Sequence, residues 1–491
     1  MRRLYASICA AALAGCAVGP NYRTPPAPTG VPAGAFDAAR PGTAALADLP
    51  DQWWRLYDDP ALNELVEQAL RENYDLRTAA ANLAQAQAIL DEARAELLPL
   101  TTVNAGGSVS KRSTGGNAVG GSSGTEFVYS GGFNVSYELD LFGRIRRTIE
   151  AARGDLSAQA AARDFTRVTV AAATTQAYVD ACAYEQSANV ARRSFQVVQQ
   201  SYNLTAFQER AGALSDFEVV RERALLDQTG AAIPALEAQR RAALYQLAVL
   251  TGRPPEQVSP AARACAKPPP LRRPLPVGDG VGLLKRRPDV REAERFLAAD
   301  TARIGISTAD LYPTVTLGGS VSGAALNPTR LLDAHTIGYG VGPAVSWAFP
   351  NFVPARARIR AAQAVAQADL SRFDSTILTA LQETEQALST YAGALDRRVA
   401  LQSARDNDAR ALQLAQTRYV AGSVSFLDLL TSQSTLVGDE NALAVQEQAV
   451  ADDQVAVFRA LGGGWMDAPE VKPLPLDSTQ KARTPKVHSN G

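Results

Sequence analysis

The sequence offers few side chains of the types and spacing that catalysis or metal binding requires. It contains two histidines, His335 and His488, and His488 lies three residues from the end of a polar tail. Metal sites and general acid–base catalysis both depend heavily on histidine. Cys182 and Cys265 have no partner at metal-ligand spacing, and Cys182, in an alanine-rich helical stretch, is interpreted as a small buried residue rather than a reactive thiol. We therefore expect no enzymatic activity, no metal and no bound cofactor.

Charge and motif content argue against further classes of function. Lysine and arginine number 49, against 50 aspartates and glutamates, so the sequence lacks the basic excess typical of nucleic-acid-binding proteins. No glycine-rich phosphate loop occurs at a predicted strand–helix junction, which argues against nucleotide binding. Glu383 and Glu385 lie in a predicted long helix, where paired acids are interpreted as part of a solvated face. A hydrolase of the cell wall is therefore a disfavoured alternative.

The N-terminus has the pattern of an export signal. Arg2 and Arg3 form a positive segment, and residues 4–13 form a mostly apolar run that is too short to span a bilayer as a helix. Residues 1–15 are therefore predicted to be a signal peptide. No other stretch resembles a transmembrane helix, so we expect any membrane span to consist of strands.

The end of this signal resembles the lipobox of bacterial lipoproteins, because residues 13–16 read Leu-Ala-Gly-Cys. The resemblance implies cleavage before Cys16, a thioether-linked diacylglycerol on its sulfur and an acyl chain on its new amino group. Three acyl chains exceed what stable anchoring needs. Ala17 in place of aspartate implies passage to the outer membrane. Residues 16–50, rich in proline, alanine and glycine, are predicted to be a tether. An ordinary signal peptide that happens to contain a cysteine is the alternative.

The remainder of the chain repeats itself at a spacing of about 210 residues. Segments that match in the same order include Asp75-Leu76-Arg77 with Asp289-Val290-Arg291, Gly-Gly-Ser-Val-Ser at 106–110 and 318–322, Val135-Ser136-Tyr137 with Val345-Ser346-Trp347, and 210–215 with 420–425. Several matches at a nearly constant offset indicate an internal duplication. We expect a first repeat at 51–251, a proline-rich linker without helix or central strand at 252–280, a second repeat at 281–465 and a polar C-terminal tail at 466–491.

Each repeat is predicted to contain a helix, two strands, a long helix, a turn and a second long helix. In the first helix, leucines recur every seven residues with alanines between them: Leu76, Leu83, Leu90, Leu97, Ala79, Ala86 and Ala93. This spacing is typical of helices packed as in a coiled coil. The next helix is predicted to extend from near Gly143 to a turn at Gly212, about 100 Å at roughly 1.5 Å per residue, and its duplicate from near Pro354 to Gly422. We expect Pro234 to kink the helix that returns from the first turn.

The predicted strands alternate between an apolar face and a small or polar face. This pattern covers residues 133–141 and 337–349, and shorter partners are expected at 101–110 and 314–322. Alternation over about ten residues is typical of transmembrane strands, although a half-buried strand of a soluble sheet gives the same pattern. Four strands are too few for a closed barrel, and open edges in lipid are costly. Several chains must therefore share one barrel, and a trimer supplies a dozen strands.

The duplicated unit, the leucine–alanine helices and the paired glycine turns resemble the TolC/OprM-type outer-membrane efflux proteins over about residues 51–465. The lipid signal, residues 16–22 and Trp53-Trp54-Arg55-Leu56-Tyr57 are similar to the lipoprotein branch, the NodT-like outer-membrane factors of resistance–nodulation–division pumps. The resemblance implies a mainly α fold with membrane β: a trimeric twelve-stranded β-barrel, four strands per chain, continued by a long periplasmic α-helical barrel.

The resemblance also carries over to residues around the two turns. It implies that the turns are tips that dock a periplasmic adaptor, through Gly212, Ala213, Leu214, Ser215, Gly422, Ser423, Val424 and Ser425. Glu218 and Asp428 match positions that face the lumen near its constriction, and Tyr419 matches a tyrosine of the gate. Helix capping and a solvated helix surface are the alternatives for these positions.

Two residues depart from the family pattern at the gate. Val424 stands where many members have arginine, and Thr431 replaces a second lumenal aspartate. Arg418 or Arg221 can substitute in the bonds that close the gate; otherwise the gate is looser than in those members.

The resulting expectation is the outer-membrane channel of a tripartite efflux system. It exports small toxic compounds such as antibiotics, and its partners are two further copies of the chain, an adaptor, an inner-membrane pump and outer-membrane lipids. A duct for peptide or protein secretion is the first alternative, because cargo is chosen largely upstream. A periplasmic adaptor lipoprotein is the second, and the duplication of strands and hairpins argues against it.

Overall fold

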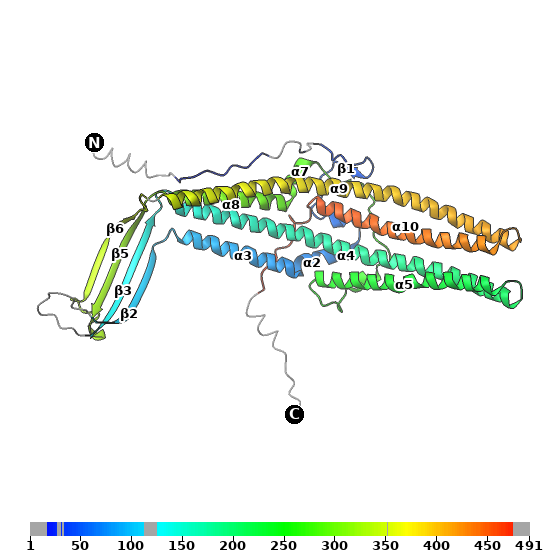
Figure 1. Ribbon diagram of the computed structural model, residues 1–491, viewed down its shortest axis with the longest axis horizontal. Coiled ribbons are helices and arrows are strands. Elements are labelled where there is room, and N and C mark those ends of the chain that lie inside the picture. Colours follow the sequence, from blue (N-terminus) through cyan, green and yellow to red (C-terminus); the bar gives the residue numbers. More distant parts are fainter. Residues whose placement is uncertain (1–16, 27–30, 32–33, 112–124, 351, 475–491) are drawn as a thin grey trace, which may run out of the picture. The chain divides into compact units, whose positions relative to one another are not determined.

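The structure is a computed structural model that describes residues 17–26, 31, 34–111, 125–350 and 352–474 (Figure 1). The predicted signal peptide, the predicted lipidation site Cys16, and the end of the C-terminal tail with His488 lie outside the described residues. The chain forms two compact units, and each draws on both repeats. Unit 1 contains the described parts of Met1–Pro26, Ala84–Ala158 and Ala293–Phe373; unit 2 contains those of Ala27–Leu83, Gln159–Glu292 and Asp374–Gly491.

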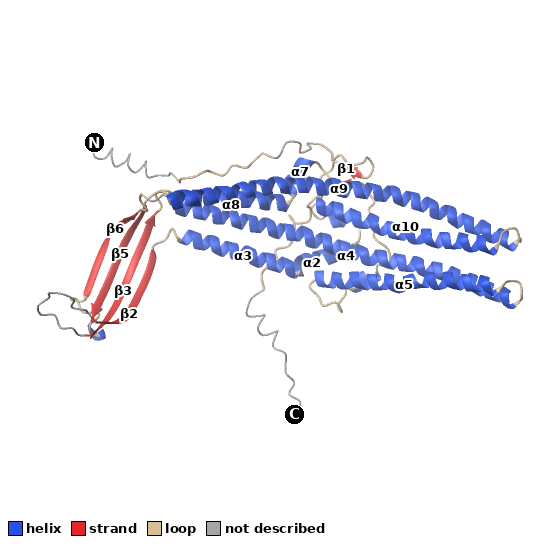
Figure 2. Cartoon of the chain, in the orientation of Figure 1, coloured by secondary structure: helices blue, strands red, loops and turns tan. Residues whose placement is uncertain are grey.

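Unit 1 contains a sheet of four antiparallel strands (Figure 2). The strands are β2 (Leu100–Lys111), β3 (Thr125–Leu139), β5 (Thr314–Ala325) and β6 (Ile337–Ser346), hydrogen-bonded in the order β2–β3–β5–β6. Two strands per repeat are thus confirmed, and pairing of β3 with β5 joins the repeats. Three strands are longer than expected: β2 and β5 each have 12 residues, and β3 begins at Thr125 instead of near Phe133.

One face of this sheet carries an unbroken row of large apolar side chains. Val103 pairs with Phe133, Phe133 with Val321, and Val321 with Tyr339, so the row crosses all four strands. Directly opposed residues of antiparallel strands share a face. In the isolated chain these side chains are exposed, Val103 by 81% and Tyr339 by 87%. Among the described residues, β2 and β6 each pair with one strand only, so the sheet has two open edges.

The helices follow the predicted order in both repeats. The first repeat has α3 (Tyr74–Ala95), α4 (Arg144–Arg210) and α5 (Asp216–Leu250), and the second has α8 (Pro288–Ala309), α9 (Val353–Val420) and α10 (Phe426–Ala460). The shorter helices α2 (Pro60–Glu72) and α7 (Gly280–Arg286) precede α3 and α8. The two longest helices have 67 and 68 residues. Pro234 lies inside α5, which continues through it. Of the helices in the described ranges, none combines the length and the hydropathy needed to cross a bilayer.

The core of unit 2 is built on aromatic residues of the segment that precedes α2. Trp53 and Trp54 belong to the 3₁₀-helix η1 (Trp53–Tyr57) and are almost completely buried. The Trp53 ring stacks on Phe458 of α10, with centroids 4.5 Å apart. The Asp51 carboxylate also accepts four backbone N–H bonds from residues 464–467, at 2.8–3.2 Å. The start of the predicted polar tail is therefore held against the start of the first repeat.

The predicted linker at 252–280 contains two short regular elements, and the helix among them corrects the expectation that its prolines exclude helix. Pro260 is the first residue of α6 (Pro260–Ala264), where its missing N–H costs nothing. The two-residue strand β4 (Leu275–Pro276) pairs in parallel with β1 (Ala44–Ala45). The linker is thus hydrogen-bonded, through β4, to the strand β1 of the predicted tether.

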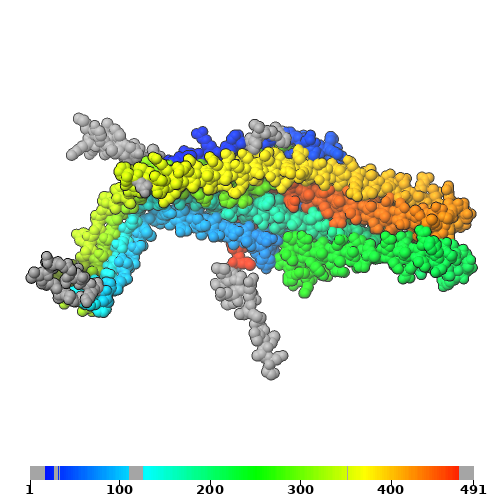
Figure 3. Space-filling view, viewed as in Figure 1, coloured from blue at the N-terminus to red at the C-terminus, as the bar shows by residue number. Residues whose placement is uncertain are grey.

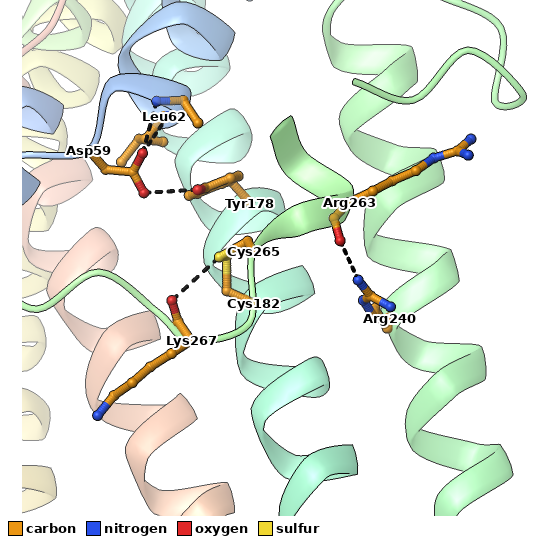
Figure 4. Close-up of a disulfide and its surroundings, with 9 residues drawn as sticks. Asp59, Leu62, Tyr178, Cys182, Arg240, Arg263, Cys265 and Lys267 are labelled. Carbon is orange, nitrogen blue, oxygen red and sulfur yellow. Dashed lines mark hydrogen bonds between the residues drawn. A yellow bond between two sulfur atoms is a disulfide. The ribbon is translucent and has the colours of Figure 1, made fainter. Parts of the chain in front are cut away.

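Cys182 and Cys265 correct a second expectation, because the structure joins them in a disulfide (Figure 4). Cys182 is fully buried, as predicted, on α4. Cys265 directly follows α6. The two cysteines are 83 residues apart, a separation that carries no local spacing signal. The bond links the linker to α4 and closes the hairpin of α4 and α5 into a covalent loop.

Candidate functional site: the ends of two helix hairpins

The two hairpin turns share one backbone geometry, and a glycine determines it. Gly212 and Gly422 have φ angles of 76° and 71°, which is the left-handed conformation that favours glycine. In the first turn, Ala213 N donates to Gln208 O at 2.9 Å and Gly212 N donates to Glu209 O at 2.8 Å. The second turn repeats both bonds at equivalent positions. This Schellman arrangement satisfies the last carbonyls of α4 and α9 and reverses the chain within five residues, 211–215 and 421–425.

Glu218 and Asp428 each cap the helix that follows a turn. The Glu218 carboxylate accepts from the backbone N of Ser215 at 3.0 Å and from the Ser215 hydroxyl. Asp428 accepts from Ser425 N at 3.0 Å and from Ser425 Oγ at 2.7 Å. These hydrogen bonds lower the pKa of both carboxyls below the ordinary value, so both stay ionised at neutral pH. The capping role is thus present in the single chain.

The two hairpins end in the green and orange surface at one extremity of the space-filling view (Figure 3), and the exposed residues there include many with apolar side chains. Both turns are largely exposed, with Leu214 and Val424 half-buried. The exposed apolar residues on the adjoining helix turns are Leu204, Phe207, Phe217, Val220, Val420 and Leu427. Val420 is 88% exposed, directly before the second turn. The surface of a soluble protein rarely exposes so many apolar side chains in one place, and a patch of this kind usually marks a contact site for a partner.

Tyr419 is the next-to-last residue of α9, close to the end of the second hairpin. Its ring makes an edge contact with Phe426 of α10, with centroids 6.0 Å apart. Burial raises the pKa of Tyr419, and the nearby charge of Glu218 raises it further, so the phenol stays neutral. Of the two arginines considered for the gate, Arg221 packs over the Phe217 ring at 5.5 Å, and no ion pair of Arg418 or Arg221 occurs within the described ranges.

An apolar cluster beneath the turns holds the hairpins together, and it contains a carboxyl group that sequence reasoning missed. Val198, Leu225, Leu226 and Leu430 form its buried part. Glu222 of α5 is fully buried, and neither carboxyl oxygen has a geometrically acceptable hydrogen-bond partner. Burial raises the pKa of Glu222, while the neighbouring Ser201 hydroxyl lowers it slightly. A period of 3.6 residues places Glu222 beside Glu218 and Leu226, which is the only sequence signal for its position.

A pair of half-buried aspartates joins α4 to α10 farther from the turns. Gln176 of α4 donates to Asp452 Oδ1 at 2.6 Å, and Gln448 of α10 donates to Asp180 Oδ1 at 3.0 Å. Burial, together with the charge of Asp180, raises the pKa of Asp452 to about 7. This pair was not predicted, because the two aspartates are remote in sequence. Within the described ranges, no group of three or more His, Cys, Asp or Glu side chains can hold a metal ion.

Known proteins share both the sequence pattern and the fold of this chain. The family model described as "Outer membrane efflux protein" matches residues 65–253 and again 281–463. Nodulation protein T of Rhizobium leguminosarum bv. viciae is 30% identical over 99% of this chain and 98% of its own length. The toluene efflux pump outer membrane protein TtgC of Pseudomonas putida is 31% identical over 93% of this chain and 94% of its own. The solved structure of the outer-membrane channel OprN superposes with a TM-score of 0.84 at 34% identity, covering 92% of this chain and all of that one.

Proposed function

This chain belongs to the outer membrane efflux protein family and is an outer-membrane efflux channel, and from that premise we propose how its geometry builds the duct. Three copies assemble around one axis. Their sheets close a twelve-stranded barrel in the outer membrane, and their long helices continue it as a periplasmic tunnel. The observation that carries this proposal is the four-stranded sheet with an apolar row across it and two open edges.

The open edges make the single chain unsuitable for a membrane. Each unpaired backbone N–H or C=O in lipid costs several kcal/mol, on the order of magnitude known for apolar media. Every strand of the sheet is antiparallel to its neighbour, so β6 of one copy can pair in the antiparallel sense with β2 of the next. The ring then closes without an edge. The row of Val103, Phe133, Val321 and Tyr339 becomes a continuous lipid-facing band.

The hairpin ends are the proposed docking tips and gate. Docking of a periplasmic adaptor on Gly212, Ala213, Leu214, Ser215, Gly422, Ser423, Val424 and Ser425 is supported by the exposed apolar side chains beside these turns. Threefold copies of Glu218 and Asp428 form acidic rings, which favour cations in a narrow lumen. Tyr419, close to the end of the second hairpin and within the electrostatic influence of Glu218 on the first, is the proposed gate residue.

Transport through the duct requires no chemistry by the chain itself. An inner-membrane pump of the resistance–nodulation–division type drives cargo through it after the adaptor draws the tips apart. Small toxic organic compounds are the proposed cargo, because relatives carry names such as toluene efflux pump outer membrane protein. Acyl chains on Cys16 anchor the N-terminus in the outer membrane, as the lipobox-like residues 13–16 suggest.

Crosslinking of the tips tests the gate. Ala213→Cys and Ser423→Cys place thiols on two exposed turns, and a bismaleimide joins them in cells. Dye efflux should stop in the double variant treated with the bismaleimide and continue when the same variant is treated with a monofunctional maleimide, which labels the turns without bridging them. Unchanged efflux through a duct whose tips are held together contradicts the proposed gate.

A further inference from the structure

Residues 17–22, which directly follow Cys16, are held by a set of contacts at the junction of strands and helices in unit 1. Val18 N donates to Phe142 O at 3.1 Å, between the end of β3 and the start of α4. Arg147 of α4 donates from Nε to Val18 O at 3.2 Å, and from Nη2 to Gly19 O at 3.4 Å and Asn21 Oδ1 at 2.7 Å. Figure 1 draws this segment in dark blue.

Most of the hydrogen-bonding capacity of the buried Arg147 side chain is used to hold residues 18–21. Its side chain is 3% exposed, and its remaining nitrogen Nη1 donates to Glu150 Oε2 at 2.7 Å. A buried guanidinium is tolerated only where its donors are satisfied. Three of the four hydrogen bonds that satisfy it come from residues 18–21. If that segment left, Arg147 would keep a single partner.

Three glycines allow the backbone to approach this closely. A Cβ on Gly19, where φ is +89°, would lie 2.5 Å from Gly305 Cα of α8. A Cβ on Gly305 would lie 2.8 Å from Arg147 Cδ, and a Cβ on Gly143 would lie 2.6 Å from Ala17 Cα. Glycine inside a helix is less favourable than alanine, so its presence there needs a reason. The contact with Arg147 and Gly19 is the physical reason for a glycine inside α8.

A second contact lies farther along α8. The Tyr22 hydroxyl donates to Glu294 Oε1 at 2.9 Å, and Thr24 Oγ1 donates to the same oxygen at 3.2 Å. Burial and the bond to Glu294 raise the pKa of Tyr22 to about 12, so it remains a donor at any physiological pH. The segment therefore contacts α8 at two positions, Gly305 and Glu294, whereas a flexible tether would make no fixed contacts.

We infer that Arg147, Gly143 and Gly305 form a dock for the segment that follows the lipidated cysteine, and that the dock fixes Ala17, the residue bonded to Cys16, at the β3–α4 junction. The inference rests on the proposed lipid anchor. In the proposed barrel this junction marks the periplasmic edge of the bilayer, where the Phe142 and Tyr312 rings stack with centroids 4.6 Å apart. The acyl chains then enter the membrane beside the barrel wall, and the positioning residue is Arg147.

Thiol labelling of the full-length protein in outer-membrane vesicles tests the dock. Val18→Cys puts a half-buried thiol in the segment while leaving its backbone bonds intact. The acyl chain blocks Cys16, and the disulfide occupies Cys182 and Cys265. We expect slow maleimide labelling in this background. Arg147→Ala should accelerate it about tenfold or more, because the lost bonds are charge-assisted.

Two companion variants separate docking from folding. Gly305→Ala favours the helical state of α8 but places a methyl against the Arg147 side chain, so it should also accelerate labelling. Arg153→Ala removes an exposed arginine of α4, the helix that carries Arg147, and should leave the labelling rate unchanged. SDS-resistant trimers in every variant show that the fold is intact. Fast labelling in the parent background, or equal rates in parent and Arg147→Ala, overturns the dock.

Mass spectrometry of the N-terminal peptide shows whether Cys16 is acylated, and so tests the proposed lipid anchor separately from the dock. An unacylated Cys16 contradicts the proposed anchor and the placement of its acyl chains. Protection of Val18→Cys in that same sample still establishes the dock, and an acylated Cys16 with an unprotected thiol refutes the dock alone.

Discussion

The disulfide between Cys182 and Cys265 should contribute a measurable share of the stability of unit 2. The perturbation is Cys182→Ala with Cys265→Ala. At an offset of 210, the second repeat has Ala392 where the first has Cys182, and Ala392 is likewise buried, at 3% exposure. Alanine is therefore compatible with the packing of α4, and the double variant removes the covalent bond with little change in shape.

The magnitude follows from the size of the loop that the bond closes. With a sequence separation of 83 between the cysteines, crosslinking lowers the entropy of the unfolded chain by about 15 cal/mol/K, or about 4.5 kcal/mol at about 25 °C. Unfolding entropy is about 2.1 cal/mol/K per residue, which amounts to about 1 kcal/mol/K for 491 residues. Loss of the bond should therefore lower the unfolding temperature of the chain by about 4 °C.

Thermal melting of the trimer, followed by tryptophan fluorescence with and without a reductant, measures this shift. The fluorescence reports largely on unit 2, because three of the four tryptophans, Trp53, Trp54 and Trp465, belong to it. Reductant should lower the melting temperature of the parent by about 4 °C and leave the double variant unchanged. Equal melting temperatures of the oxidised parent and the double variant refute the reasoning.

Three further predictions concern the helix hairpins. Glu222→Gln should raise the melting temperature at about pH 8 but hardly at about pH 4, because burial raises the pKa of this carboxyl and its ionisation opposes folding only above the unfolded pKa of 4.5. An equal shift at both pH values contradicts this. Asp452, with a pKa raised from 3.8 to about 7, contributes stability that is complete below about pH 4 and lost as the pH rises to about 7. Asp452→Asn should therefore flatten the melting profile between about pH 4 and about pH 7, whereas an unchanged slope refutes the role of its pair with Asp180. Gly422→Ala should destabilise the second turn by about 1 kcal/mol, because the φ angle of Gly422 is +71° and alanine is strained there. The loss should appear as faster amide hydrogen exchange at this turn. Gly438→Ala within α10 is the control and should not accelerate exchange.

Periodicity in the sequence was sufficient to predict the elements. The alternation at 133–141 and 337–349 indicated strands, and the turn glycines indicated both hairpins. The heptad leucines predicted packing on α3: Leu76 and Leu90 are buried, whereas Leu97 lies beyond the end of the helix and is 44% exposed. These predictions succeed because local backbone geometry and amphipathic pattern depend on neighbours within a few residues.

Contacts between remote residues could not be predicted in the same way. The disulfide, the four N–H bonds to Asp51 and the carboxyl pair of Asp180 and Asp452 each join residues whose local context is ordinary. Nothing within a few positions of Asp51 indicates a partner more than 400 residues away. One signal was present but was not used: Gly305 interrupts a helical pattern, and an unexplained glycine in a helix suggests close backbone approach.

Sharing of one barrel by several chains is the central claim, and native mass spectrometry of the protein extracted from outer membranes tests it most directly. We expect particles that contain three chains, because only neighbouring copies can pair the free edges of β2 and β6. A particle that holds a single chain, still folded and still inserted in lipid before extraction, contradicts the claim.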